Sequence, residues 1–384
     1  MLIPIHFNAR IWKVLSWSIL MLYCMSPVRA QTVAEEFKPS GKIWGYAFGD
    51  FFVKTGGDTA TWASRLIYSG VPKKVYAFSL RRLYLGYDYT ISPTFSTSVI
   101  LEGSDAVLTA KGERSVFIKA LFLKWKNIYR GGDLLIGQMP TLSYSTFFEK
   151  LWGYRSIERT MLDQRAIRPS SDMGVALYGS FDSLRTFGYD IMISNGTGVK
   201  PEELTQLGKH KVYAGDIFGY FFDRQIMIDL YADYQTGPND QFVSSLHGFV
   251  VYQTEPVTFG IEVFSGLQNN VKSDGSAVKP FGVSLFTRGR IIKDKLNAFA
   301  RYDSYNPDIR YRDIDAITIY NAASMNNHYD EQFITAGLDF IPHKNVHLLP
   351  NIWINSYKAK ADNAVLVHRK ADIVPRITFY FIFK

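Results

Sequence analysis

The sequence predicts an all-β protein that spans a membrane, as a closed antiparallel barrel of about sixteen strands with a long third loop folded inward. Two observations support this prediction. Segments of about ten residues alternate between apolar and polar side chains. The connections between these segments alternate between short turns and longer polar stretches. In addition, no run of eighteen apolar residues follows residue 30, so the sequence offers no membrane-spanning helix there.

The first thirty residues have the composition of an export signal. Arg10 and Lys13 precede a mostly apolar run, and Val28 and Ala30 are small residues that suit cleavage before Gln31. An uncleaved anchor is the alternative, but a spanning helix needs roughly 20 apolar residues. We therefore expect residues 1–30 to be a cleaved signal peptide and residues 31–384 to form a single outer-membrane barrel domain.

Composition narrows the possible partners and cofactors. The only cysteine, Cys24, lies in the predicted signal, so the mature chain has no disulfide and no thiolate metal site. Removing the three basic signal residues from the 43 in the chain leaves 40 against 35 acidic residues, a net charge of +5. No polybasic run accompanies this charge, so it does not indicate a nucleic-acid partner. No residue pattern indicates a cofactor.

The predicted strands each have one apolar and one polar face. In "RLYLGYDYTI", Leu83 and Leu85 lie opposite Arg82, and in the last segment, "RITFYFIFK", Ile377 lies opposite Arg376. The polar faces carry many charged residues in the interiors of strands. These are Arg82, Lys124, Asp190, Asp229, Asp233, Arg288, Arg301, Asp339 and Arg376.

These charges favour a barrel with a water-filled lumen over a soluble β-sandwich, which is the main alternative. A sandwich buries its inner faces in one core and has no regular alternation of long and short connections. In lipid, every backbone polar group must be paired within the protein, so a sheet can span a bilayer only if it closes. The apolar faces then contact outer-membrane lipid and the polar faces line the lumen.

The connections predict the two ends of the barrel. Seven short turns contain Pro, Gly, Asp or Asn, as tight turns require, at 92–94, 129–133, 182–185, 222–225, 254–257, 292–294 and 342–345. The longer stretches are 54–74, 104–114, 140–171, 197–210, 236–241, 267–279, 304–330 and 359–370. Both chain ends then lie on the side of the short turns, where the last strand closes the barrel by pairing with the first near "GKIWGYAFGD".

The third long stretch, 140–171, differs from the others because it is long and rich in aromatic residues. We expect it to pack inside the barrel as a constriction loop, with short helical turns around "TFFEKLW" and "SIERTML". If it lines the lumen, its basic residues favour anions. These are Lys150, Arg155, Arg159, Arg165 and Arg168. The alternative is that its acidic residues, such as Glu158, pair with the arginines and leave little net field.

The segments "LLIGQMP", "TFFEKLWGYRSIERTMLDQ" and "SDMGVALYGSF" resemble the phosphate-selective porin O and P family, in the form common in Bacteroidetes-type outer membranes. In that family, a strand ending in Gly and Pro leads into an inward-folded third loop. The resemblance implies a homotrimeric porin of the outer membrane, through which small anions or other hydrophilic solutes diffuse. Phosphate follows a ladder of basic lumen residues in named members.

Several basic residues of this chain lie on the polar faces of strands and extend the predicted anion path. They are Arg82, Lys124, Arg288, Arg301 and Arg376. Acidic residues are interspersed with them, so no continuous basic ladder matches the family. The function expected from the sequence is therefore passive diffusion of small hydrophilic solutes with a preference for anions, and only the family resemblance implies that these anions are phosphate-like.

Two other classes of function remain as alternatives. A specific binder or adhesin would use the long loops 54–74 and 304–330. A barrel hydrolase would need a nucleophile and a base, for which Ser304 with His247 or His328 has the residue types, but no known spacing supports it. His343 and His347 flank a Pro/Asn turn, where their spacing does not form a metal site. We therefore expect no enzyme activity and no metal.

Overall fold

The computed structural model describes residues 37–58, 66–203, 208–316, 318, 327–361 and 369–383. The chain divides into a unit of residues 1–38 and a unit of residues 39–384, and the second unit contains every strand. The predicted signal peptide, residues 1–30, lies outside the described residues. Within the described part of the chain, none of the helices has the length and apolar character needed to cross a membrane.

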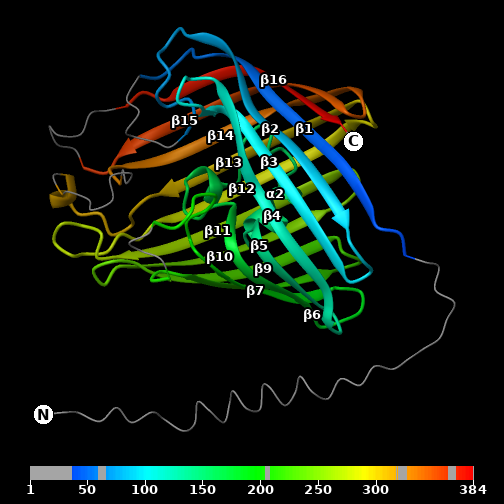
Figure 1. The fold of residues 1–384 in the computed structure, drawn as a ribbon. Coiled ribbons are helices and arrows are strands. Elements are labelled where there is room, and N and C mark those ends of the chain that lie inside the picture. Colours follow the sequence, from blue (N-terminus) through cyan, green and yellow to red (C-terminus); the bar gives the residue numbers. More distant parts are fainter. Residues whose placement is uncertain are drawn as a thin grey trace, which may run out of the picture. The chain divides into compact units, whose positions relative to one another are not determined.

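The second unit is a closed barrel of sixteen antiparallel strands, as predicted (Figure 1). The first eight strands are β1 (Ser40–Val53), β2 (Tyr76–Thr90), β3 (Phe95–Leu108), β4 (Arg114–Tyr129), β5 (Gly132–Pro140), β6 (Ser171–Ser180), β7 (Phe187–Ser194) and β8 (Val212–Phe221). The others are β9 (Ile226–Thr236), β10 (Phe242–Gln253), β11 (Val257–Asn269), β12 (Phe281–Ile292), β13 (Leu296–Asn306), β14 (Tyr329–His343), β15 (Val346–Ala359) and β16 (Asp372–Phe383). Each strand pairs with its neighbours in sequence.

The ends of the sheet meet between β1 and β16. Their ladder runs from Gly45 opposite Phe383 to Phe52 opposite Arg376. This confirms that the last segment is the closing strand and that it pairs with the predicted first strand. The outward residues of β16 are exposed and the inward ones are buried: 50% of Ile377 is exposed, against 4% of Arg376. The apolar row at the end of the chain therefore faces outward, where a bilayer would cover it.

Deleting residues 376–384 is expected to abolish the folded barrel. The deletion removes every β16 residue in the ladder with β1, so it leaves two open sheet edges with unpaired backbone groups, which lipid does not tolerate. The measurement is the heat-modifiable gel mobility of the refolded protein in detergent. A truncated chain that still migrates as a compact, heat-modifiable species would contradict the role of this strand.

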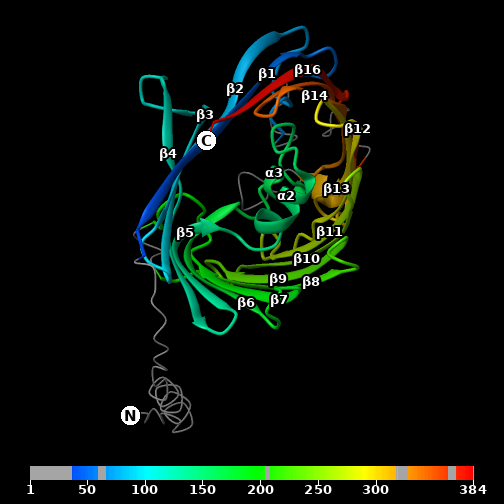
Figure 2. The ribbon, with the colours of Figure 1, turned by 90° about the vertical axis from the view of Figure 1, so that its right-hand side faces the viewer.

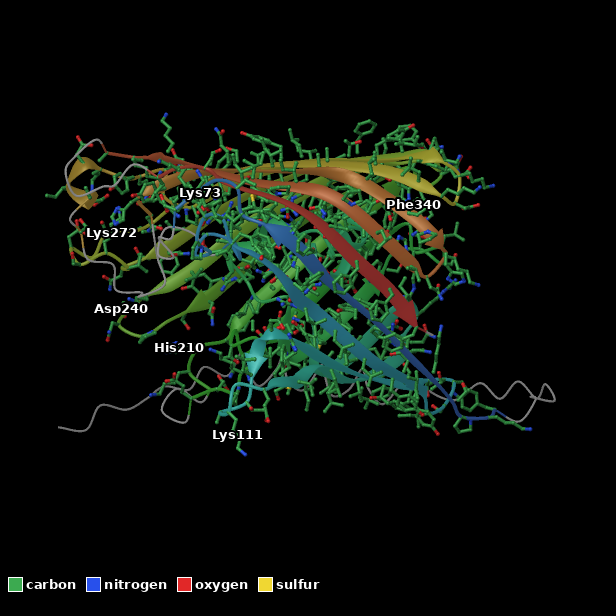
Figure 3. The ribbon with its side chains drawn as sticks, turned by 90° about the horizontal axis from the view of Figure 1, so that it is seen from above. Lys73, Lys111, His210, Asp240, Lys272 and Phe340 are labelled. Atoms are coloured by element: carbon green, nitrogen blue, oxygen red, sulfur yellow. The ribbon has the colours of Figure 1, made fainter. Side chains whose placement is uncertain are left out.

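All seven predicted short turns join paired strands at one end of the barrel, and the long connections lie at the other. Figure 3 shows Lys73, His210, Asp240 and Lys272 toward the end with the long loops and Phe340 toward the opposite end. The second long stretch is shorter than predicted, because β3 continues to Leu108 and β4 begins at Arg114. A short 3-10 helix, η4 (Asp313–Ala316), lies in the connection between β13 and β14.

Candidate functional site

The third long loop folds into the barrel. We call residues 141–170, between β5 and β6, loop 3. It contains the π-helical turn η2 (Tyr144–Phe148) and the helices α2 (Glu149–Trp152) and α3 (Met161–Gln164). Figure 2 looks into the barrel and shows α2 and α3 inside the ring of strands. The predicted inward fold is therefore confirmed. A helical turn occurs in the first predicted place, whereas the second helix, α3, overlaps the predicted segment "SIERTML" only at its last two residues.

Apolar packing holds loop 3 against one side of the barrel wall. Phe148, Trp152 and Ile157 are fully buried. They form one cluster with inward residues of β9, β10, β12, β13 and β15, namely Met227, Phe249, Val251, Phe286, Phe299 and Leu349. Because the loop packs against this wall, a cavity remains on the other side, between loop 3 and strands β1, β2 and β3.

Arginines from the strands hold the backbone of loop 3. Arg81 Nη1 on β2 donates to the carbonyl oxygens of Ser156 and Ile157, at 2.9 and 2.7 Å. Arg376 Nη2 on β16 donates to the same Ile157 oxygen at 2.6 Å. Arg301 Nη1 on β13 donates to the carbonyl oxygen of Arg159. Hydrogen bonds from charged donors are stronger than neutral ones, so these residues fix the position of the loop.

The Glu158 carboxylate is buried at the centre of these contacts. Its Oε2 accepts a hydrogen bond from Trp353 Nε1 at 3.1 Å, and its Oε1 lies 3.6 Å from Arg81 Nη2. Burial raises the pKa of Glu158, but the surrounding guanidinium groups lower it more, so that the pKa lies below its usual value. Glu158 is therefore ionised at neutral pH and contributes a fixed negative charge within loop 3.

The predicted basic residues of loop 3 have different environments. Four of them form ion pairs: Arg155 with Glu149 and Asp163, Arg159 with Asp163 at 3.3 Å, Arg165 with Glu331, and Arg168 Nε with Asp233 at 2.9 Å. Lys150 is exposed. Arg165 and Arg168 are buried against the barrel wall, so they attach the loop to β14 and β9. The alternative of a salt-bridged loop thus describes these two arginines well.

The predicted basic residues of the strands also face inward. Four of them pair with carboxylates on the same wall: Arg82 with Glu102 at 2.7 Å, Lys124 with Asp133 at 2.8 Å, Arg301 with Asp303 at 2.6 Å, and Arg376 with Asp50 at 3.4 Å. Arg288 forms no ion pair with any described residue, and its Nη1 lies close to Gly153 of loop 3. Arg301 and Arg376 are buried, and each donates to a backbone carbonyl oxygen of loop 3.

In three of these ion pairs, the basic side chain is more exposed than its carboxylate partner. The exposed fractions of the side chains are 24% for Arg82 against 5% for Glu102, and 23% for Arg159 against 10% for Asp163. They are 27% for Lys124 against 3% for Asp133. The carboxylates lie behind the cations, so a solute in the lumen meets positive charge first, although each pair is neutral.

Comparison with solved structures identifies the type of barrel. The outer-membrane channel DcaP of Acinetobacter baumannii aligns over 90% of this chain and 97% of its own, with 12% identity and a TM-score of 0.62. The anion-selective porin of Comamonas acidovorans aligns over 90% and 100%, with 11% identity and a TM-score of 0.58. Salmonella typhi OmpF aligns over 89% and 97%, with 12% identity and a TM-score of 0.56. The fold is that of the outer-membrane porins.

The comparisons with known proteins give no finer assignment. No family model matches the chain, and no curated protein matches it. At identities near 12%, the similarity concerns the fold alone. The resemblance to the phosphate-selective O and P family therefore stays a prediction, whereas the sixteen-stranded porin fold is established.

Two inward basic residues of this porin fold were not predicted. The ladder of β1 and β2 steps from Phe48 opposite Arg82 to Gly49 opposite Leu80, so Arg81 is an extra residue in a β-bulge. A bulge interrupts the alternation of faces, and both neighbouring arginines therefore point inward.

A second bulge, in the ladder of β3 and β4, brings Lys119 inward in the same way. Its Nζ donates to Ser170 of loop 3 at 2.9 Å and lies 3.4 Å from Glu102.

One signal in the sequence could have revealed the first bulge. A doublet of arginines within an apolar strand would otherwise place a charge on the lipid face, which is costly.

The root of loop 3 contains a buried chain of hydrogen bonds. The Ser143 hydroxyl lies 2.9 Å from His247 Nδ1, and His247 Nε2 lies 2.8 Å from Glu262 Oε1. This is the order of a hydrolytic triad, but all three side chains are buried and Ser143 also donates to Asp229. A nucleophile without access to solvent cannot receive a substrate, so the chain of bonds anchors the loop.

The other predicted alternatives have different contacts in the structure. His247 contacts Ser143 and not Ser304, and His328 Nδ1 lies 2.9 Å from the Tyr311 hydroxyl. His347 contacts Asp339 at 2.8 Å. Across the described residues, no group of His, Cys, Asp or Glu has the arrangement of a metal site. Part of the first long loop, including Tyr68, is buried and does not project outward as an adhesin loop would.

Proposed function

We propose that this chain forms a water-filled channel of the outer membrane, through which small hydrophilic solutes diffuse passively and anions pass preferentially. The proposal rests on the ion pairs beside the narrowed lumen, in which the basic side chain is more exposed than the carboxylate. The guanidinium groups of Arg82 and Arg159 face the cavity, and their carboxylate partners lie behind them. Charge at a narrow site sets ion preference, and basic groups favour anions.

Other observations support parts of this proposal. A planar guanidinium suits phosphate-like oxyanions, in line with the family resemblance. The exposed apolar residues of the outer face suit contact with outer-membrane lipid. A trimer form of the structurally similar Vibrio cholerae OmpT supports a homotrimer, although its identity to this chain is only 12%. The burial of the Ser143 and His247 side chains supports a channel without enzyme activity.

The test is the reversal potential of the purified protein in a planar bilayer with a gradient of potassium chloride. We expect a reversal potential toward that of chloride. The double substitution Arg82→Gln and Arg159→Gln is expected to lower the permeability ratio of chloride to potassium about twofold to tenfold, because it removes two exposed cations from the narrow region.

The matched control removes two positive charges that do not line the cavity beside Arg82 and Arg159. Lys293→Gln and Lys344→Gln change exposed residues on two short turns, and they are expected to leave the permeability ratio nearly unchanged, since exposed charges outside the narrow region are screened by salt. A folded wild-type barrel without conductance would refute the channel. A conducting double variant with the wild-type ratio would refute the anion preference.

A further inference from the structure

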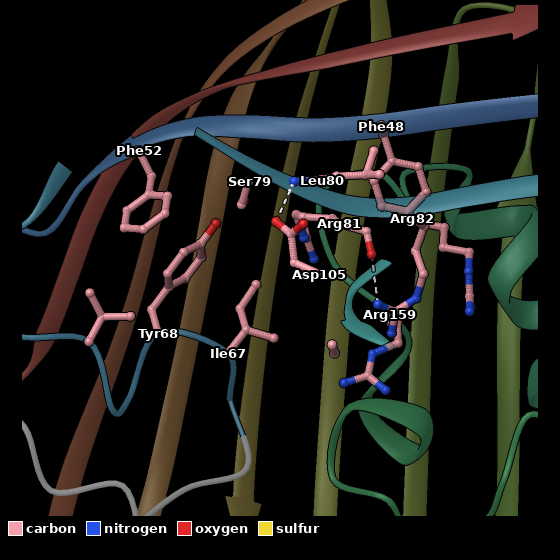
Figure 4. A pocket seen from close by; sticks show the side chains of 13 residues that line it. Phe48, Phe52, Ile67, Tyr68, Ser79, Leu80, Arg81, Arg82, Asp105 and Arg159 are labelled. Atoms are coloured by element: carbon pink, nitrogen blue, oxygen red, sulfur yellow. Dashed lines mark hydrogen bonds between the residues drawn. The ribbon is translucent and has the colours of Figure 1, made fainter. Parts of the chain in front are cut away.

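The cavity between loop 3 and the β1–β3 wall has two chemically distinct sides. Its volume is about 360 Å³, within the range of small-molecule sites. Figure 4 shows Phe52, Ile67 and Tyr68 on one side and Arg82 and Arg159 on the other. An inorganic anion would use only the basic side. The apolar side therefore indicates a more specific ligand.

The apolar side of the cavity leaves an aliphatic side chain open to the lumen. Ile67 is 43% exposed, although it lines the cavity next to the buried rings of Phe52 and Tyr68. Removing such a surface from water is favourable, so a ligand with an apolar body gains free energy here that a small inorganic ion does not.

The basic side retains hydrogen-bond donors for a ligand. Arg82 Nε lies 2.7 Å from Glu102 Oε1 in an ion pair, and Arg82 Nη1 donates to the carbonyl oxygen of Arg81. Arg159 uses Nη1 for Asp163, and its Nε lies 3.9 Å from Glu158. Within the described chain, the Nη2 groups of both arginines have no partner. These two groups can therefore donate to a carboxylate without breaking the existing ion pairs.

Among the described residues that line the cavity, one is acidic, Asp105, and its charge is paired. Asp105 Oδ2 accepts a hydrogen bond from the Leu80 amide at 2.6 Å, and its Oδ1 accepts one from Arg114 Nε at 2.5 Å. The charge of Asp105 is thus balanced by Arg114 at the rim. Both oxygens of Asp105 accept hydrogen bonds, so the exposed charged groups left to meet an anion in the cavity are those of Arg82 and Arg159.

We propose that this cavity is a binding site for organic anions that carry a single carboxylate on an aromatic or branched apolar body, as they cross the channel. The carboxylate binds Arg82 and Arg159, and the apolar body lies against Ile67, Phe52 and Tyr68. The inference rests on the proposed channel function and names the class of solute that the channel retains longest.

The test compares four solutes in the planar bilayer at neutral pH: benzoate, acetate, benzyl alcohol and inorganic phosphate. Benzoate is expected to reduce the chloride current at a concentration about tenfold lower than acetate, because only benzoate covers the apolar side. Benzyl alcohol is expected to have no effect, because it lacks the charge. Inorganic phosphate acting at a lower concentration than benzoate would contradict the proposal and indicate a site for inorganic anions.

Substitution of Ile67 tests the apolar side separately. Ile67→Asn is expected to raise the inhibitory concentration of benzoate about threefold and to leave that of acetate unchanged. Ile309→Asn is the matched control, since Ile309 is similarly exposed on another long loop, and it is expected to change neither. An Ile67→Asn channel that still binds benzoate like the wild type would overturn the assignment.

A direct binding measurement separates this proposal from the channel function. Saturation-transfer NMR of benzoate with the protein in detergent reports binding even if the protein does not conduct. We expect a benzoate signal that is weaker in Ile67→Asn, in line with the roughly threefold loss of affinity, and unchanged in Ile309→Asn. A conducting barrel without this signal would overturn the site and leave the channel in place. A benzoate signal without conductance would refute the channel and leave the site in place.

Discussion

Arg376→Leu is expected to lower the free energy of unfolding by about 3 kcal/mol, the lower end of the range for breaking a buried ion pair. The substitution removes the partner of Asp50, whose side chain is fully buried, together with the hydrogen bond to the Ile157 carbonyl oxygen. The Asp50 carboxylate still lies 3.5 Å from Arg81 Nε in this variant, which reduces the expected loss of stability. The measurement is urea unfolding in detergent, followed by tryptophan fluorescence.

Two further variants make this prediction specific. Arg290→Leu removes the same type of side chain from an exposed pair with Glu255, and such pairs contribute only about 0–1 kcal/mol. Adding Asp50→Asn to Arg376→Leu is expected to recover part of the lost stability, because the uncompensated charge disappears. An Arg376→Leu protein as stable as Arg290→Leu would mean that the pair contributes no more than a surface contact.

Trp152→Ala is expected to release loop 3 from the wall and to produce a larger and noisier single-channel conductance. Trp152 is fully buried between loop 3 and the strands, and its Nε1 donates to the Glu158 carbonyl oxygen at 2.9 Å. Loss of a buried tryptophan side chain costs about 3–5 kcal/mol, and here the cost falls on the contact between loop and wall. Single-channel recording in a planar bilayer measures the change.

The same substitution on the outer face provides the control. Trp125 packs against Phe95 on the outward side of β3 and β4 and is exposed. Trp125→Ala is therefore expected to leave the single-channel conductance unchanged. If Trp152→Ala also left it unchanged in a folded protein, loop 3 would be held by its ion pairs, with no need for the aromatic cluster.

The sequence by itself determined the barrel, because its signals are local. Alternation of faces is a property of neighbouring residues, so the outward position of Ile377 and the inward position of Arg376 follow from the spacing alone. The lengths of the connections predicted which strands share tight turns. The requirement that lipid-exposed sheets close then fixed the pairing of the last strand with the first.

Contacts between distant residues decided the site, and only the tertiary structure contains them. Arg165 and Arg168 of loop 3 lie buried against Glu331 and Asp233 of the wall, which no local spacing indicates. Which charge of an ion pair faces the lumen depends on how deeply each group lies beneath its neighbours, as with Arg82 and Glu102.

The bulge at Arg81 is a second feature that the sequence alone did not predict, in this case within one strand. Strict alternation places one residue of the Arg81–Arg82 doublet outward, whereas the structure turns both inward by adding one residue to the ladder. A bulge is defined by the register of two strands, and register is a relation between segments. The sequence thus determined the barrel and the faces of its strands, and the tertiary structure decided which charges meet inside it.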